Sequence, residues 1–279
     1  MMQGKRDMKR LFKKEELKLH DFPQGKNLIR SIEGMDRLNK LFSRDIIKKW
    51  WDAQKVCLTW TRDKKIFPED YVGSSKLAYD AYFQKRGPLK GKLVDVGGGW
   101  GLFRQWWKPG KSAFYIVHDP GIERFLRGPH KLHYKHYKKA FSLPMSFVEG
   151  YGEKLPYKDN IFDTWINMAA LDHCIDTQMV MKEAYRVLKP KGTVIVIQRI
   201  HKHQAEHKKL YLLKRLLKHL PHPRRLLYII YNRLVYKDEH LHHFEKGDMV
   251  DLLKRAGFSN ITTTEIPYME NNFAFEGRK

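Results

Sequence analysis

From residue 91 onward, short apolar runs alternate with segments that have helical periodicity. The apolar runs predict strands at 92–96, 112–119, 145–150, 161–169, 193–198, 260–266 and 272–278. Asp176 precedes a helical pattern in which Val180, Ala184, Val187 and Leu188 share one face. A second helix, at 246–258, is expected to stop at Gly257. Alternating helices and continuously apolar strands predict an α/β fold with a doubly wound, mostly parallel sheet covered by helices on both faces.

Before residue 75 the pattern is helical. Residues 43–55 begin with the N-cap candidate Ser43 and place Ile46, Ile47 and Trp50 on one face. Another helix is expected to begin after Ser75 and to stop at 87–88, a Gly-Pro pair, with a loop between the two helices. We therefore expect a helical N-terminal extension over 1–74 and a main domain over 75–279.

Charge and cysteine content limit the class of protein. The chain has 54 Lys and Arg against 31 Asp and Glu, a net charge of +23, which favours anionic partners. Its 2 cysteines, Cys57 and Cys174, cannot form a disulfide framework and are typical of a reducing compartment. No apolar stretch approaches the ~20 residues of a membrane span, and the charged N-terminus does not resemble a signal peptide. We expect a cytoplasmic protein, with peripheral contact at the inner membrane surface as an alternative.

The stretch "LVDVGGGWG" at 93–101 places Asp95 at the end of the first strand and alternates Gly97, Gly99 and Gly101 after it. Leu102 stands where the dinucleotide fingerprint has its third glycine. Asp119 follows about twenty residues after the loop at the end of the second strand, where an acid can hold the hydroxyls of a ribose. A tight turn alone would also account for the glycines, but the acids and the strand–helix setting favour a ligand site.

Several motifs in order resemble one family. "VDVGGGWG", "HDP", "FVEGYGEKLPYKDNIFD" (147–163), "MAALDHC", "MVMKEAYRVLKPKGTVIV" and "DLLKRAGF" are similar to those of class I S-adenosylmethionine-dependent methyltransferases, in the ubiquinone and menaquinone branch. The resemblance covers roughly residues 75–277. It implies a Rossmann-like sheet of seven strands with an antiparallel last strand, a methyltransferase activity and S-adenosyl-L-methionine as cofactor.

The resemblance also implies roles for the motif residues. The methionine part of the cofactor would lie against Gly97, Gly99 and Gly101, with Asp95 orienting the loop near its amino group. Asp119 would hold the ribose, and Met168, at the end of the fourth strand, would border the sulfonium.

One position departs from the family pattern. Tyr151, followed by Gly152 and Glu153, stands where the family has an aspartate that meets the adenine. Either Tyr151 stacks beside the adenine with its backbone making the polar contact, or Glu153 replaces the missing acid. The alternative for Glu153 is a cap or an ion pair.

After the fourth strand, "LDHC" offers a candidate base. His173 is placed to deprotonate a weakly nucleophilic acceptor, with Asp172 orienting it, although a structural hydrogen bond explains it equally well. Cys174 is interpreted as packing, and His242 and His243 are further candidates for the pocket. The histidines of "HYKHYKK" have no acidic or thiol partners nearby, so we expect no metal.

A basic segment over 200–240 follows the fifth strand and is expected to be a helical insertion that forms a substrate lid. Residues 201–240 hold ten Lys or Arg against three acids, mixed with leucines and tyrosines. Such a segment could contact an anionic membrane, a phosphorylated substrate or RNA. The first hypothesis is a methyltransferase for a small-molecule, glycan or lipid-linked acceptor. The alternatives are an RNA methyltransferase and a non-catalytic binding module.

Overall fold

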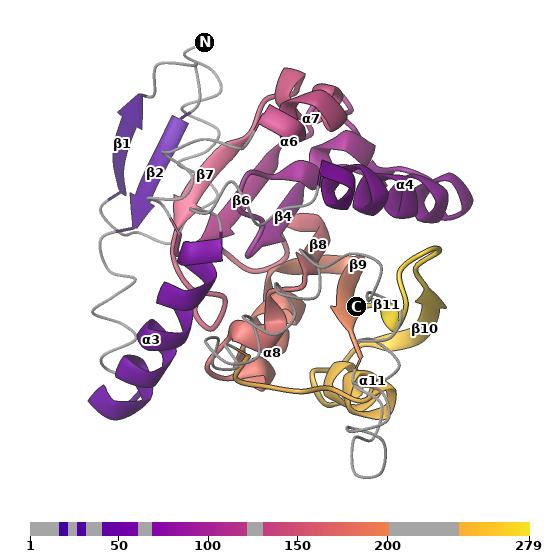
Figure 1. The fold of residues 1–279 in the computed structure, drawn as a ribbon. Coiled ribbons are helices and arrows are strands. Elements are labelled where there is room, and N and C mark those ends of the chain that lie inside the picture. The colour runs from indigo at the N-terminus through magenta and orange to yellow at the C-terminus, as the bar shows by residue number, and fades with distance from the viewer. Residues whose placement is uncertain (1–16, 22–26, 32–40, 61–68, 122–130, 201–239) are drawn as a thin grey trace, which may run out of the picture.

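The computed structural model describes residues 17–21, 27–31, 41–60, 69–121, 131–200 and 240–279. Nine strands of this described part form one sheet, in the order β1-β2-β7-β6-β4-β8-β9-β11-β10 (Figure 1). Their bounds are Leu17–Asp21 (β1), Asn27–Ser31 (β2), Leu93–Val96 (β4), Tyr115–Asp119 (β6), Ser146–Glu149 (β7), Phe162–Met168 (β8), Leu188–Arg199 (β9), Ser259–Glu265 (β10) and Asn272–Arg278 (β11). A separate pair joins Leu89–Lys90 (β3) to Trp107–Lys108 (β5).

The chain runs outward from β4 in two directions. β6 and β7 follow on one side and β8 and β9 on the other, and every pair from β2 to β9 is parallel. β11 is antiparallel to both β9 and β10. The doubly wound, mostly parallel sheet and its antiparallel last strand are therefore confirmed. The order reverses between β4 and β8, where α/β sheets bind ligands beyond the carboxyl ends of the strands.

Helices cover both faces of the sheet. On one side lie Glu69–Arg86 (α4), Lys131–His136 (α6) and Lys138–Ser142 (α7), with the short 3-10 helix Leu102–Trp106 (η1). On the other lie Thr177–Val187 (α8) and Lys246–Arg255 (α11) (Figure 1). Each face has its own apolar core, one built on α8 and α11 and the other on α4 and η1. None of the described helices has the length and apolar character needed to cross a bilayer.

The N-terminal segment is not wholly helical. β1 and β2 lie inside the predicted helical extension and add two strands to the expected seven, because β2 pairs in parallel with the edge that β7 would otherwise expose. The sequence pattern "LKLHD" alternates apolar and polar residues over too short a span to stand out. α4 begins at Glu69, ahead of the expected Ser75, and so crosses the predicted domain boundary. The division into domains stays a prediction.

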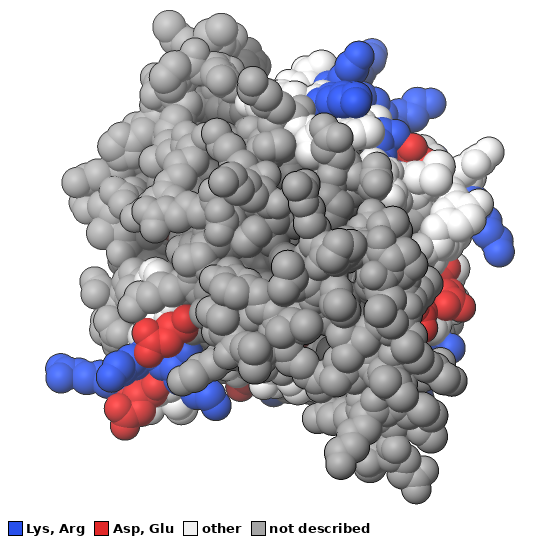
Figure 2. Space-filling view, in the orientation of Figure 1, with Lys and Arg blue, Asp and Glu red and all other residues white. Residues whose placement is uncertain are grey.

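The helix Arg44–Trp60 (α3) lies apart from the two helical layers, near the second 3-10 helix, Leu171–His173 (η2). Its exposed charges are mixed in sign: Arg44, Asp45, Lys48, Lys49 and Asp52. Figure 2 shows red and blue side chains together at the lower left, where α3 lies in Figure 1. The basic excess of the chain is therefore not concentrated on α3. The basic segment 201–239 lies outside the described residues.

Candidate active site

The glycine loop follows β4 at the carboxyl end of the sheet. Gly97, Gly99 and Gly101 all have left-handed backbones, with φ of 72°, 51° and 64°. An added Cβ would lie 2.4 Å from the Cβ of Ala170 at Gly97 and 2.8 Å from Cγ2 of Val117 at Gly101. At Gly99 it would meet nothing within 4 Å. Two of the glycines are thus required by packing, whereas an added Cβ at Gly99 would point into open space.

Asp119 joins the glycine loop to the turn after β6. Its Oδ2 accepts a hydrogen bond from the Gly99 N–H at 2.9 Å, and its Oδ1 accepts one from the Gly121 N–H at 2.6 Å. Each carboxylate oxygen can accept a second bond, and the residue is only partly buried. Asp119 therefore stands beside the open space at Gly99 with acceptor capacity for a pair of hydroxyls.

Asp95 supports the loop from inside the protein. Its side chain is fully buried, and Tyr115 donates a hydrogen bond to Oδ2. A Cβ at Gly98 would lie 2.3 Å from the Asp95 Cγ, so the carboxylate packs directly against the loop. Burial raises the pKa of Asp95 to about 7, the Tyr115 hydrogen bond lowers it, and the nearby charge of Asp119 raises it further. Oδ1 has no hydrogen-bond partner within the described residues.

Arg104 holds the other end of the loop, and sequence reasoning missed it. The guanidinium donates to the carbonyl oxygens of Gly101 at 3.0 Å, Trp100 at 3.2 Å and Leu143 at 2.6 Å. The residue is 1% exposed, and burial lowers its pKa to about 10. The only signal in the sequence is a cation inside the otherwise apolar "LFRQWW". A buried arginine usually fixes backbone that has no regular partner.

The end of β8 lies next to the loop. Asn167 is fully buried, and its Nδ2 donates to the carbonyl oxygen of Val96 at 2.8 Å, which ties the ends of β8 and β4 together. Met168 is partly buried at the last position of β8, packed against the core on the α4 side of the sheet. Sequence reasoning singled out Met168 and missed Asn167. The amide has no signal of its own in a strand that reads as apolar.

Beyond β8, η2 carries Asp172 and His173. Asp172 is 4% exposed, and its Oδ2 accepts a hydrogen bond from Gln198 Nε2 at 2.7 Å. His173 Nε2 lies 3.8 Å from Asp172 Oδ1, and His240 Nε2 lies 3.6 Å from Asp172 Oδ2. Trp50 of α3 donates its Nε1–H to the His173 carbonyl oxygen at 2.8 Å. The helix α3 therefore packs against η2 at one side of the candidate site.

A comparison with models of protein families identifies the domain that carries these residues. Residues 94–196, which run from β4 into β9 and include the glycine loop, Asp119 and η2, match the family model described as a methyltransferase domain. This region is a class I S-adenosylmethionine-dependent methyltransferase domain. The cofactor that the family implies is S-adenosylmethionine.

Curated relatives point to the quinone branch of this methyltransferase family. The chain is 31% identical over 110 residues to the 2-methyl-6-phytyl-1,4-hydroquinone methyltransferase 1 of Oryza sativa subsp. japonica, which covers 39% of this chain and 31% of that protein. It is 33% identical over 109 residues to a ubiquinone/menaquinone biosynthesis C-methyltransferase of Neisseria meningitidis, over 38% of this chain and 42% of that protein. The chain thus spans less than half the length of both relatives.

A solved structure supports the fold. A protein from Pyrococcus horikoshii OT3 superposes with a TM-score of 0.50 at 17% identity, covering 74% of this chain and 90% of that one. At that identity the likeness speaks for the Rossmann-like fold alone.

Tyr151, at the position predicted to lie beside the adenine, makes its contacts within the protein. The Tyr151 ring is buried edge-to-face against Trp50 of α3, with ring centroids 5.0 Å apart. Its carbonyl oxygen accepts a hydrogen bond from His118 Nε2 at 3.1 Å, while the other ring nitrogen of His118 lies 3.2 Å from the Tyr157 hydroxyl. Burial lowers the pKa of His118 to about 4, so the ring is neutral and one nitrogen must accept. The Tyr151 ring contacts α3 and its carbonyl oxygen is already hydrogen-bonded to His118.

Glu153 takes a structural contact. Its Oε1 accepts from the backbone N–H groups of Ile175 at 2.7 Å and Asp176 at 3.3 Å, just before α8. The side chain is 3% exposed, so this cap lies in the interior. Gly152 is equally enclosed, because its Cβ would meet Val96 Cγ1 at 3.1 Å. The contacts of Glu153 are those of the capping alternative, and its role toward an adenine stays a prediction.

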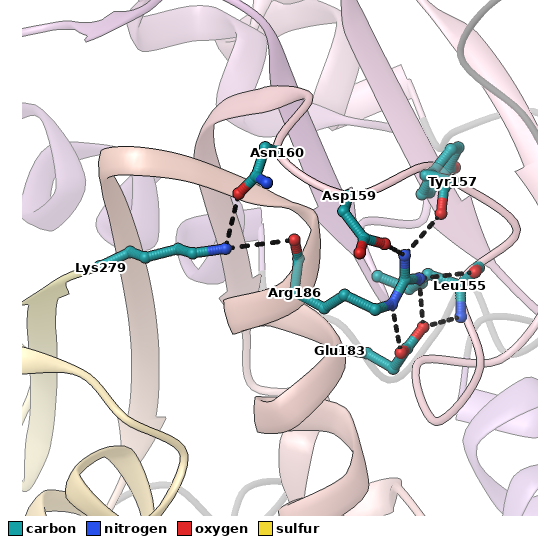
Figure 3. A network of polar contacts seen from close by, with 7 residues as sticks. All are labelled: Leu155, Tyr157, Asp159, Asn160, Glu183, Arg186 and Lys279. Carbon is teal, nitrogen blue, oxygen red and sulfur yellow. Dashed lines mark hydrogen bonds and ion pairs between the residues drawn. The ribbon is translucent and has the colours of Figure 1, made fainter.

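Arg186 of α8 holds the loop after β7 in place (Figure 3). Its guanidinium donates to the carbonyl oxygens of Leu155 at 3.0 Å and Tyr157 at 2.7 Å, and to the carboxylates of Asp159 at 2.6 Å and Glu183 at 2.7 Å. Glu183 also accepts the Leu155 N–H at 2.7 Å. Lys279, at the end of β11, donates to the Arg186 carbonyl oxygen at 3.3 Å. The network fixes the loop that follows the predicted adenine-side positions.

The remaining residues that were predicted to lie on the acceptor side differ in burial and in hydrogen bonding. Cys174 has a pKa well above its usual value because it is buried, and its Sγ donates to the Ala170 carbonyl oxygen, which agrees with a packing role. His242 donates its Nε2–H to the Cys174 carbonyl oxygen at 3.0 Å. His243 is exposed. His240 instead joins His173, and sequence reasoning missed it because it closes the basic segment.

Proposed function

We propose that this chain transfers the methyl group of S-adenosylmethionine to a small hydroquinone-type acceptor that carries an apolar tail. The observation that carries the proposal is the Asp119–Gly99 pair, a part-buried carboxylate with spare acceptor capacity beside open space at a left-handed glycine. Of the two relatives, one is named a hydroquinone methyltransferase and the other a C-methyltransferase of ubiquinone and menaquinone biosynthesis. The net charge of +23 further favours an acceptor or a surface with negative charge.

The residues of the site fit the cofactor. Asp119 would hold the ribose hydroxyls, and the glycine loop would allow the methionine part to approach the backbone closely. When bound, S-adenosylmethionine supplies an electrophilic methyl group. The protein contributes chiefly by aligning the acceptor and by excluding water, for which Trp50 and Tyr151 form an apolar wall with α3.

His173 stands on the acceptor side of this arrangement. Its side chain is 18% exposed, and its carbonyl oxygen is fixed by Trp50. Direct proton transfer from an acceptor hydroxyl to its imidazole is one role that this position allows, with Asp172 orienting the ring. The other role is to bind a metal ion together with His240.

Cofactor binding is tested first. Calorimetry with S-adenosylhomocysteine should give one site in the unmodified chain, and Asp119→Ala should weaken it by roughly 2–4 kcal/mol, because two charge-assisted hydrogen bonds are lost. Asp251→Ala, on the exposed face of α11, is the control and should bind normally. Unchanged affinity in Asp119→Ala would contradict the assignment of the ribose site.

The acceptor is tested by labelled methyl transfer. The chain is incubated with methyl-labelled cofactor and, separately, with a prenylated hydroquinone, a tail-free hydroquinone, a phosphorylated glycan and RNA. We expect label in the prenylated hydroquinone, with less in the tail-free one. Label in RNA alone would overturn the proposed acceptor and favour the RNA methyltransferase that the net charge also permits.

A further inference from the structure

Three potential metal ligands meet where η2 lies against the segment that begins at His240. Asp172, His173 and His240 each offer one ligand atom, and these atoms all lie within 4.8 Å of one another. The two histidine rings are stacked with centroids 4.8 Å apart and an interplanar angle of 30°. The carboxylate-to-imidazole separations of 3.6 and 3.8 Å are too long for hydrogen bonds. The side chains face one another, but neither imidazole is hydrogen-bonded to the carboxylate.

The carboxylate at the centre of this cluster has an unsatisfied oxygen. The Asp172 side chain is 6% exposed, and its Oδ1 has no hydrogen-bond partner within the described residues. A buried carboxylate oxygen without a partner is costly, and buried acids of this kind are usually paired or bound to a metal. Among the described residues, Gln198 Nε2 donates a hydrogen bond to the other oxygen, Oδ2, at 2.7 Å. That arrangement is typical of a ligating carboxylate held by an outer hydrogen bond.

The backbone keeps the two halves of the cluster together. The Asp172 carbonyl oxygen accepts hydrogen bonds from the Leu241 N–H at 2.8 Å and from the His242 N–H at 3.2 Å. His240 is therefore held over η2 by its immediate neighbours in the chain. In a tetrahedral Zn²⁺ site the ligand atoms are about 3.3 Å apart. Small side-chain rotations would bring the three groups to that spacing without moving the backbone.

We propose that Asp172, His173 and His240 bind one divalent transition-metal ion, with Zn²⁺ as the reference ion. Two imidazoles and one carboxylate are a ligand set that suits such ions, and three protein ligands leave a coordination position open. The expectation that the chain binds no metal rested on the lack of acidic or thiol partners near the histidines of "HYKHYKK", whereas this cluster joins residues from two distant segments. In this proposal His173 binds the ion and does not act as a general base.

The position of the ion follows from its neighbours. Ala170, whose Cβ would meet a Cβ at Gly97, precedes Asp172 by two residues, so the cluster lies near the glycine loop at the carboxyl end of the sheet. If the proposed methyl transfer is correct, the open coordination position would take an oxygen of the acceptor. Binding of the ion itself does not depend on that activity. The bound ion would also link His240, at the end of the basic segment, to η2.

The test is a titration of the chelator-treated full chain with Co²⁺, a spectroscopic substitute for Zn²⁺. We expect one equivalent to give the ligand-field absorption of a nitrogen- and oxygen-ligated ion, and added Zn²⁺ to displace it. Asp172→Asn and His240→Ala should each abolish this absorption. Gln198→Ala should weaken binding by about 10- to 100-fold, because it removes only the outer hydrogen bond. His136→Ala, a histidine of α6 outside this cluster, is the control and should bind like the unmodified chain.

Circular dichroism and melting temperature check that the variants fold, and His240→Ala, at a partly exposed position, guards against a misfolded Asp172→Asn. Absence of a stoichiometric site would overturn the proposal. Equal binding to the unmodified chain, Asp172→Asn and His240→Ala would overturn it too, because histidines elsewhere would then hold the ion. Neither result depends on the calorimetry with S-adenosylhomocysteine, so failure here and failure of the proposed function can be told apart.

Discussion

The proposed cofactor side of the site is held by residues that are close in the sequence, whereas the proposed acceptor side is assembled from distant ones. Asp119 reaches Gly99 across 20 residues, within one strand–loop–strand unit. Trp50 reaches His173 across 123 residues, and His242 reaches Cys174 across 68. Local chain geometry therefore sets the first half, while the second exists only once α3, η2 and the residues after 240 have come together.

The glycines provide the largest expected effect on the cofactor side. Gly101→Ala should lower the free energy of unfolding by about 2–4 kcal/mol, since the new Cβ would strain a left-handed backbone and meet Val117 and Met145. Gly99→Ala should cost only about 1 kcal/mol of stability, because its Cβ meets no atom, yet it should weaken S-adenosylhomocysteine binding. Urea denaturation and calorimetry measure the two quantities.

Gly110→Ala is the matched control, since nothing lies within 4 Å of its Cβ and its φ is not left-handed. It should leave both stability and binding unchanged. Equal destabilisation by Gly99→Ala and Gly101→Ala would show that the loop is only a tight turn and that Gly99 does not face a ligand.

Two buried titrating groups near the cofactor side should give opposite pH dependences. The pKa of Asp95 is raised from 3.8 to about 7, so between these values the folded state holds a proton that the unfolded state has released, and stability falls as pH rises. The pKa of His118 is lowered from 6.5 to about 4, so the unfolded state binds the extra proton and stability rises with pH. The Asp95 shift corresponds to about 4 kcal/mol and the His118 shift to about 3 kcal/mol, so the two largely cancel.

Single variants separate the two contributions. Relative to the unmodified chain, Asp95→Asn should make stability rise more steeply between about pH 4.5 and 7, because only the His118 contribution remains. His118→Gln should make it fall over the same range. Urea midpoints at several pH values measure both slopes. Identical slopes in the two variants would mean that neither group titrates with a shifted pKa in the folded protein.

The smallest effect concerns the joint between α3 and η2. Trp50→Phe keeps the ring beside Tyr151 but removes the Nε1–H that binds the His173 carbonyl oxygen, so stability should fall by about 1 kcal/mol. Urea denaturation measures the loss, and limited proteolysis should show faster cleavage within α3. Trp51→Phe, at the next position, is the control. An equal loss in Trp51→Phe would show that general apolar packing, rather than this hydrogen bond, holds α3.

Features that depend on neighbouring residues could be predicted from the sequence. Asp176 accepts the Met179 N–H at 2.9 Å as the expected N-cap of α8, and Gly257 has the φ of 103° expected at the end of α11. The five parallel strands from β4 to β9 could be located because each is a continuous apolar run in a sheet covered on both faces.

The contacts that were missed have no local pattern. Arg104 meets carbonyl oxygens that only tertiary structure brings to it, and His240 becomes a partner of His173 through backbone contacts made by its neighbours. β1 and β2 depend on the free edge of β7, which a pattern of single residues does not reveal. The roles of His173 and Glu153 toward substrate and cofactor stay predictions.

The Trp50–His173 hydrogen bond also bears on the order in which the chain folds. Contacts between residues far apart in sequence form late, because the entropy of closing a long loop must be overcome before they add stability. The sheet from β4 to β9 can form from neighbouring segments, whereas α3 needs η2 in place before it can dock. We therefore expect a folding intermediate with an intact sheet and glycine loop and an undocked N-terminal helix. In refolding, the phase of tryptophan fluorescence that is lost in Trp50→Phe would follow the recovery of the sheet's circular dichroism.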